Sequence, residues 1–295
     1  MAFARKKLGI QLTLADDGES APLDDAGSRT ITLEGFRANC IVDMTGQVMA
    51  MSRLEMRIYG MTMDTMHSFM TKRLNPIETR RDIITITAGD DQTGMQKIFA
   101  GNILTAVPNF DGMPESSFDI TGQAGYYHQI NPAAANSYKG SVDAASIISA
   151  LATKMGYSFR NHGVVSKLSN QNLSGTLLDQ LSTVVEATNI VCTINNGIIE
   201  IFPNDSSVQD GPITISAQTG MVGYPRYAPT GVDVLVQFDP NITVGAEVNL
   251  VSQLPDASGQ WFVQNLRHEL SSVEAGGQFF TRVQLGKAGT YVRRY

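Results

Sequence analysis

Hydrophobic residues recur at a helical spacing in one part of the chain, residues 140–203. In Val142–Met155 the apolar side chains fall on one stripe, with Ser141 as the expected N-cap and Gly156 as the expected end. Apolar residues repeat this spacing in Thr176–Ala187. Both segments are therefore predicted to be α-helices.

After the second predicted helix, apolar residues recur at every second position instead. Apolar residues alternate in Ile190–Ile194 and in Ile198–Ile201, on either side of Asn195-Asn196-Gly197. An Asn-Gly pair favours the positive φ angles of a tight hairpin turn. A compact helix–helix–hairpin module is therefore predicted at residues 140–203.

Short alternating segments that are typical of β-strands fill the rest of the chain. Before the module they are Lys7–Leu14, Thr30–Met44, Arg53–Tyr59, Asp82–Ala88, Gln96–Ala106 and Ser117–Gly122. After it they are Ile213–Ser216, Val232–Phe238, Ala246–Val251, Trp261–Leu270 and Phe279–Leu285. A short helix is expected at Asp64–Met70, and its methionines favour core or interface packing over a dedicated partner-binding surface.

These elements predict a mainly β protein with an α+β insert. Residues 1–125 and 204–295 form two antiparallel β domains of the sandwich or barrel type. Residues 126–139 are read as a connector, and residues 140–203 as the small α/β module between the two β domains.

The net charge of the chain limits the classes of partner that it can attract. A net charge of −6 and a pI of about 5.2 disfavour nucleic-acid binding by charge attraction, but they permit contact with DNA that slides past. No apolar run approaches the ~18 residues of a membrane span, so no membrane insertion is predicted. Arg5, Lys6 and Lys7 precede Leu8–Ala15, a run that favours a first β-strand over a signal peptide.

The remaining candidate chemistry is sparse. Cys40 and Cys192 are expected to be buried free thiols, the alternative being a disulfide in an oxidising compartment. The acidic segment Asp16–Gly27 favours a solvated hairpin loop over a cation site, because its spacing fits no calcium loop.

No catalytic motif is complete. Phosphate-loop, dinucleotide and nucleophile-elbow patterns are missing from the sequence, and His268-Glu269 lacks the second histidine of a zinc-protease helix. His67, His128, His162 and His268 show no ligand spacing and are expected to be surface or hydrogen-bonded residues. Trp261 is the one tryptophan, which argues against a sugar platform. We therefore predict no catalytic, cofactor-binding or metal-binding residue, no cofactor, and no enzymatic activity.

Four stretches together carry a family resemblance. They are Arg57-Ile58-Tyr59-Gly60 running into Met61–Asp64, Ile84–Gly89 followed by Ile98–Ile103, Gly175–Leu181 followed by the Asn-Gly hairpin, and the segment from Val244 through Gly259 and Leu270 to Thr281. In this order the chain resembles the baseplate hub proteins of contractile-tailed bacteriophages, which are related to late-control protein D and to the hubs of contractile injection systems.

The resemblance implies a homotrimer in which each chain has two tube-like β-barrels. Three chains would make a ring of six barrels that joins a six-fold tail tube or tube-initiator protein to a three-fold central spike, among other baseplate proteins. DNA would pass through the pore without specific binding. The expected location is the tail baseplate of the virion, after assembly in the bacterial host cytoplasm. Because the chain is shorter than the larger hubs, no fused lysozyme or spike domain is expected in it.

Two alternatives stay open at this point. The chain is compatible with a tail-tube or tube-initiator protein that forms a hexameric ring, for which one barrel per chain would suffice. It is also compatible with a peptidoglycan hydrolase of the tail tip, which would need two carboxylates fixed across a cleft.

Overall fold

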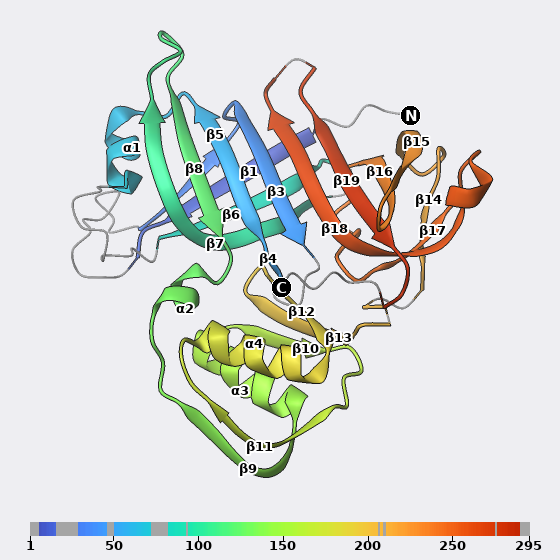
Figure 1. Ribbon diagram of the computed structural model, residues 1–295. Helices are drawn as coiled ribbons and strands as arrows, with labels where there is room; N and C mark the ends of the chain where they lie inside the picture. The colour runs from blue at the N-terminus through green and yellow to red at the C-terminus, as the bar shows by residue number, and fades with distance from the viewer. Residues whose placement is uncertain are drawn as a thin grey trace. The chain divides into compact units, whose positions relative to one another are not determined.

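A computed structural model describes residues 6–15, 29–45, 50–71, 82–92, 94–205, 207–208, 211–274 and 276–289. The chain divides into two compact units (Figure 1). The first comprises Met1–Val42, Ser52–Tyr127 and His268–Phe279, and the second comprises Asp43–Met51, His128–Arg267 and Phe280–Tyr295. The segment Asp16–Gly27, expected above to be a solvated loop, lies outside the described residues.

The first unit is a mainly antiparallel sheet. Its strands are β1 (Lys6–Thr13), β2 (Thr30–Glu34), β3 (Ala38–Thr45), β5 (Arg53–Tyr59), β6 (Ile83–Asp90), β7 (Gly94–Asn109) and β8 (Ser117–Gln123), joined by the end of β18 (Gly259–Ser272). Their order in the sheet is β18-β3-β5-β8-β7-β6-β1-β2. The alternating segments of the sequence therefore became strands, as predicted.

One face of this sheet forms the core of the unit. The strands bury their apolar residues on alternate positions, which is what a period of two produces. Fully buried side chains on this face include Ile10, Leu12, Leu54, Ile58, Ile84, Ile86, Phe99, Phe118 and Ile120. The short helix α1 (Met63–Phe69) adds Met66 and Phe69, and the Thr62 hydroxyl caps it by accepting from the Thr65 amide. Met61 and Met66 are buried, so these two methionines are core residues.

Strand β7 changes partner half-way along its length. Its residues up to Asn102 pair with β6, and its residues from Asn102 to Asn109 pair with β8. A bulge accompanies the change, between Ile103 and Thr105. At Gly101 a side chain would meet the backbone of Gln123 at 2.7 Å, so the close approach of the two strands requires glycine.

The α/β module belongs to the second unit and contains both predicted helices. Helix α4 (Leu177–Thr188) begins at Thr176 with a capping box to Asp179 and ends at Asn189 in the left-handed conformation. Helix α3 (Ala144–Met155) ends at Gly156, also left-handed, as predicted. The hairpin β12 (Ile190–Asn195) and β13 (Ile198–Pro203) turns at Asn196 and Gly197 with positive φ angles, which confirms the Asn-Gly prediction.

The start of the first helix was predicted wrongly. Ser141 is not the N-cap, because residues 136–143 form strand β9 (Asn136–Asp143) and pair with β11 (Lys167–Leu173). Val142 lies opposite Leu168 in that pair, and the helix begins only after Asp143. The expected connector at 126–139 likewise contains a short helix, α2 (Tyr126–Ile130), and the start of β9.

The other strands of the second unit follow the module. They are β14 (Ile213–Ile215), β15 (Met221–Ala228), β16 (Gly231–Gln237), β17 (Glu247–Leu250), the rest of β18 and β19 (Phe279–Gly286), with a 3-10 turn at Pro255–Ala257. Two short strands complete the unit beside the hairpin, β4 (Ala50–Met51) on β12 and β10 (Ser158–Asn161) on β13. The sequence predicted no strand between Ser216 and Val232, but residues 221–228 form β15, which ends the strand order of the described sheet and therefore tolerates Pro225. Strand β14 pairs with β17 in parallel, so this region is not a simple antiparallel meander.

Both cysteines are free and buried, as predicted. Burial raises the pKa of the Cys192 thiol to about 12 and moves the pKa of Cys40 in the same direction. Across the described residues, no helix is both long enough and apolar enough to cross a lipid bilayer.

Candidate interaction surface

The second face of the sheet in the first unit is polar and accessible. The division between the two faces is clearest on β5, where Leu54, Met56 and Ile58 point into the core. Arg53, Glu55, Arg57 and Tyr59 occupy the alternate positions and therefore point to the opposite face. The strict alternation of Arg53–Tyr59 in the sequence already predicted this arrangement.

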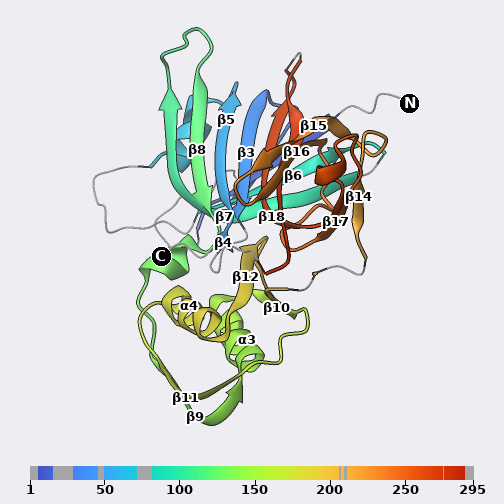
Figure 2. The same cartoon turned by 45° about the vertical axis from the view of Figure 1, so that its right-hand side comes forward.

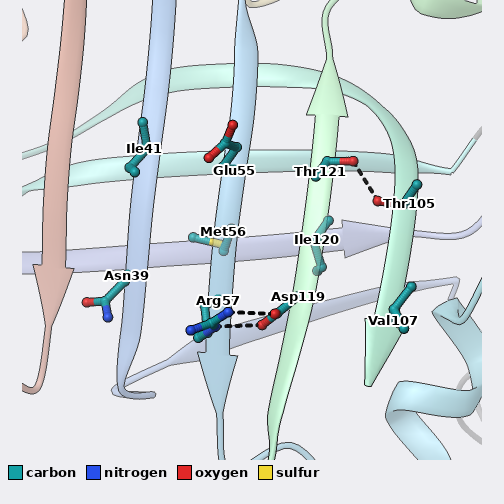
Figure 3. A pocket seen from close by; sticks show the side chains of 10 residues that line it. All are labelled: Asn39, Ile41, Glu55, Met56, Arg57, Thr105, Val107, Asp119, Ile120 and Thr121. Atoms are coloured by element: carbon teal, nitrogen blue, oxygen red, sulfur yellow. Dashed lines mark hydrogen bonds and ion pairs between the residues drawn. The ribbon is translucent and has the colours of Figure 1, made fainter. Parts of the chain in front are cut away.

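The strand register continues these polar positions across the sheet in rows. Arg57 lies opposite Asp119 of β8, and Asp119 lies opposite Val107 of β7. In the next row Glu55 lies opposite Thr121, and Thr121 lies opposite Thr105. The hydroxyls of Thr105 and Thr121 are 2.7 Å apart, within hydrogen-bond distance (Figure 3). Cross-strand pairs of this kind stabilise the sheet through contacts on its solvent-accessible face.

The strongest interaction on this face joins Arg57 and Asp119. The Nε and Nη2 atoms of Arg57 each donate to a carboxylate oxygen of Asp119 at 2.8 Å, in the bidentate geometry that arginine favours (Figure 3). The Ser117 hydroxyl donates to the same carboxylate at 3.1 Å. The hydrogen bonds from Arg57 hold the pKa of Asp119 below its ordinary value, and Asp119 in turn raises the pKa of Arg57. Both groups are therefore charged at neutral pH and compensate each other.

A shallow depression of about 410 Å³ lies over these rows (Figure 3). It is lined by Asn39, Ile41, Glu55, Met56, Arg57, Thr105, Val107, Asp119, Ile120 and Thr121. The lining contains no histidine, cysteine, serine or lysine. Its arginine is engaged by a carboxylate and its two threonines lie within hydrogen-bond distance of each other, so the depression presents polar groups that are already paired.

A second depression, of about 330 Å³, lies near the end of β18. Asn39, Cys40, Glu269, Ser271 and Glu274 are among its lining residues. The Cys40 thiol is almost fully buried and its pKa is raised, so it is a poor nucleophile. Like the first depression, this one is lined mainly by polar side chains.

The four histidines lie in different surroundings. His67 is exposed in α1, His128 meets the Tyr157 ring edge-on at 5.4 Å, and His162 lies 3.7 Å from Glu200. His268 is buried in β18, where desolvation lowers its pKa to about 4, so a surface position for this residue is wrong. Within the described part of the chain, no three His, Cys, Asp or Glu side chains gather in a way that could hold a metal ion.

A family model for the baseplate hub gp41 matches residues 24–284 of the sequence. The chain belongs to this baseplate hub family. The resemblance inferred from the sequence is thereby confirmed, and the protein is a structural component of a bacteriophage tail baseplate. No curated protein matches the sequence of this hub.

Solved structures agree with this assignment at the level of the fold. The hub resembles the 43 kDa tail protein of prophage MuSo2 from Shewanella oneidensis, with a TM-score of 0.61 and 7% identity, over 95% of this chain and 98% of that one. A tail protein from Neisseria meningitidis MC58 gives a TM-score of 0.61 and 8% identity, over 96% and 98% of the two chains.

A third similar structure is that of a secretion-system protein. It is an Escherichia coli protein described as a component of the type VI secretion system with structural similarity to the bacteriophage T4 tail proteins gp27 and gp5. The TM-score is 0.57 and the identity 9%, over 96% of this chain and 78% of that one. At such low identities these likenesses show a shared tail-protein fold.

Proposed function

We propose that three copies of this hub form a ring that joins the tail tube of a contractile phage tail to its central spike. Membership of the baseplate hub family over residues 24–284 is the observation that carries the proposal. In this role the chain is a scaffold without enzymatic activity, located in the virion baseplate after assembly in the host cytoplasm.

The proposed ring requires each chain to contain two copies of the same barrel. We propose that residues 1–125 and 204–295 are two tube-like antiparallel β-barrels that flank the connector 126–139 and the α/β module 140–203. Three chains then supply six barrels, and a threefold ring imitates the sixfold symmetry of a tube or tube-initiator protein above it. The similarity to a protein likened to gp27 and gp5 of phage T4, and to a chain of a Francisella PdpA–VgrG complex, supports a spike as the partner below.

The polar face of the first unit suits the wall of a DNA channel. Its central guanidinium, on Arg57, is held by Asp119, and Glu55 adds a further carboxylate nearby. Because the guanidinium of Arg57 is already compensated, it offers phosphate groups little attraction. The net charge of −6 acts in the same direction over the whole chain. DNA would therefore pass along this face without being held.

The mass of the assembled particle tests the proposal. Light scattering or mass photometry of the purified hub, alone and with its spike protein, is expected to give about three times 31.9 kDa for the hub ring. Electron micrographs should show a threefold ring with a central hole. A particle that stays monomeric under both conditions contradicts the proposal, and a mass of six chains would favour a tube or tube-initiator protein instead.

A zymogram addresses the enzymatic alternative. The purified hub is expected to leave a peptidoglycan gel unchanged beside a lysozyme control. Clearing that disappears when a single carboxylate is changed would show a hydrolase and overturn the non-enzymatic part of the proposal.

A further inference from the structure

The first unit carries an exposed apolar patch at the end of β7. Val107 lies at the end of the strand, and Phe110 and Met113 lie in the loop that leads to β8. All three side chains are exposed, Met113 to 69%. Figures 1 and 2 both show this loop extending beyond the neighbouring strands β5 and β3 of the same unit. We call Val107, Phe110 and Met113, together with the carboxylate of Asp111 between them, the β7 tip.

Hydrogen bonds within the loop hold the β7 tip in shape. The Asn109 side chain accepts from the Asp111 amide at 2.9 Å, and the Gly112 carbonyl accepts from the Glu115 amide at 3.0 Å. Glu115 is paired in turn with Arg37 at 2.8 Å. A loop that is already ordered loses little conformational entropy when it binds, which favours its use as an interface.

The second unit carries a different exposed patch along β15. Tyr224 is exposed to 64% and Tyr227 to 61%, and Val222 is exposed beside them. The hydroxyl of Tyr224 donates to Gln253 at 3.1 Å, which limits the freedom of its ring. We call Val222, Tyr224, Arg226 and Tyr227 the β15 edge.

The β15 edge is built for side-chain contact. In the described part of the chain, β15 pairs with β16 and ends the sheet order. The register with β16 slips between Val222 and Arg226, and Pro225, which has no amide hydrogen, lies inside the slip. A proline and a bulge both prevent a further strand from adding to an edge. A partner at this edge must therefore contact the tyrosine rings and Arg226 rather than extend the sheet.

The two patches are complementary in charge and chemistry. The β7 tip offers apolar side chains with the carboxylate of Asp111, whereas the β15 edge offers aromatic rings with the guanidinium of Arg226. Arg226 lies opposite Asp233 in the strand register, yet no ion pair joins the two in the described structure. Phe, Met, Tyr and Arg are the residue types enriched at the centres of protein interfaces.

We propose that the β7 tip of one copy of the hub docks on the β15 edge of the next copy. Two different patches on the same chain make a head-to-tail contact, and a head-to-tail contact closes into a ring when the rotation between copies allows it. This inference rests on the proposed trimeric function and identifies the surfaces through which the ring closes. Asp111 pairs with Arg226 of the next copy, and Phe110 and Met113 cover its tyrosine rings.

Charge reversal tests the contact directly. Asp111→Arg and Arg226→Asp are each expected to weaken ring assembly by at least about tenfold, because each places like charges together at the contact. The double variant Asp111→Arg/Arg226→Asp restores the opposite charges and should recover most of the trimer. Mass photometry over a dilution series measures the trimer fraction, with spike protein added if the wild-type ring requires it.

Apolar variants and controls complete the test. Met113→Asp should weaken the ring as strongly as a charge reversal, whereas Val165→Asp, an exposed valine of the α/β module, should have no effect. Circular dichroism melts establish that each variant is folded. Trimers that survive the single reversals overturn this interface and leave the trimeric function standing. A wild-type hub that forms no trimer, even with its spike, overturns the proposed function itself.

Discussion

The ammonium of Lys287 lies 3.6 Å from the centroid of the Trp261 ring, and its Nζ also donates to the carbonyl of Gln260 at 3.2 Å. The indole nitrogen of Trp261 donates to the Ala257 carbonyl at 2.9 Å, so the ring is fixed in place. A cation over a fixed indole face is one of the more favourable cation–π geometries.

Removal of this cation should be measurable. Lys287→Ala is expected to lower the free energy of unfolding by about 0.5–1 kcal/mol, the usual range for such a contact. Since Trp261 is the one tryptophan of the chain, its fluorescence reports unfolding in urea without interference. Lys287→Arg keeps a cation over the ring and should lose less stability than the alanine variant. Equal losses in both would show that the cation–π contact contributes nothing.

Removing the charges of the carboxylates beside Arg57 should increase the affinity of the polar face for DNA. The double variant Glu55→Gln/Asp119→Asn leaves the guanidinium uncompensated, so binding of a duplex oligonucleotide at 50 mM salt is expected to rise about threefold or more and to fall again as salt increases. Fluorescence anisotropy measures this. Glu186→Gln/Asp205→Asn changes the net charge equally in the second unit and is the matched control. Equal DNA binding in both variants would contradict a channel role for this face.

His268 should make the stability of the protein depend on pH. Its pKa is lowered to about 4 in the folded state by burial, against an ordinary 6.5. Between these values the unfolded chain takes up a proton that the folded protein does not, so stability falls as the pH falls from about 6.5 to 4, by up to about 1.4 kcal/mol per pH unit.

Urea unfolding between pH 7.5 and 4.5 measures this dependence. The variant His268→Gln cannot take up the proton, so its stability should decline less steeply over the same range. At pH 7.5 both side chains are uncharged, and the difference in stability between the two proteins there sets the baseline. Parallel curves for the two proteins would contradict the assignment of the slope to His268.

Gln180 should be the most sensitive polar residue of the α/β module. It is fully buried in α4, and its Nε2 donates to the carbonyls of Ala134 at 3.1 Å and Gly175 at 3.3 Å. Its Oε1 accepts from Asn136. Gln180→Leu removes all three of these buried hydrogen bonds and is expected to cost about 2–4 kcal/mol.

Hydrogen exchange localises the effect of this change. Faster exchange is expected at residues 131–136, which the Gln180 side chain ties to α4. Gln171→Leu, on the two-stranded ribbon of β9 and β11, removes a bond to Ser169 of its own strand and should cost under about 1 kcal/mol. Equal effects from both variants would contradict a tying role for Gln180.

Local signals were enough to predict the elements that depend on local chemistry. Helix α4 carries its own start in Thr176 and Asp179 and its own stop in Asn189, and the Asn196–Gly197 turn defines its hairpin. The polar face of β5 was predictable from alternation alone. These features involve residues a few positions apart, so a single sequence contains the whole signal.

Pairing between distant segments was beyond the reach of the sequence. Ser141 has the composition of an N-cap, but residues 136–143 satisfy their backbone groups by pairing with 167–173, and this tertiary contact overrides the local preference. Pro225 and Pro229 argue against a strand unless the strand is known to lie at an edge. The Arg57–Asp119 pair likewise depends on a strand register, and no local pattern gives a register between β5 and β8.

The change of partner along β7 has a mechanical consequence. One continuous strand is bonded to β6 in its first half and to β8 in its second, and the β7 tip lies at its end. Inter-strand hydrogen bonds run across the strands, so a thrust along β7 loads many of them in shear at once instead of opening them one by one. A force applied at the β7 tip would therefore be resisted by many hydrogen bonds of the sheet at once.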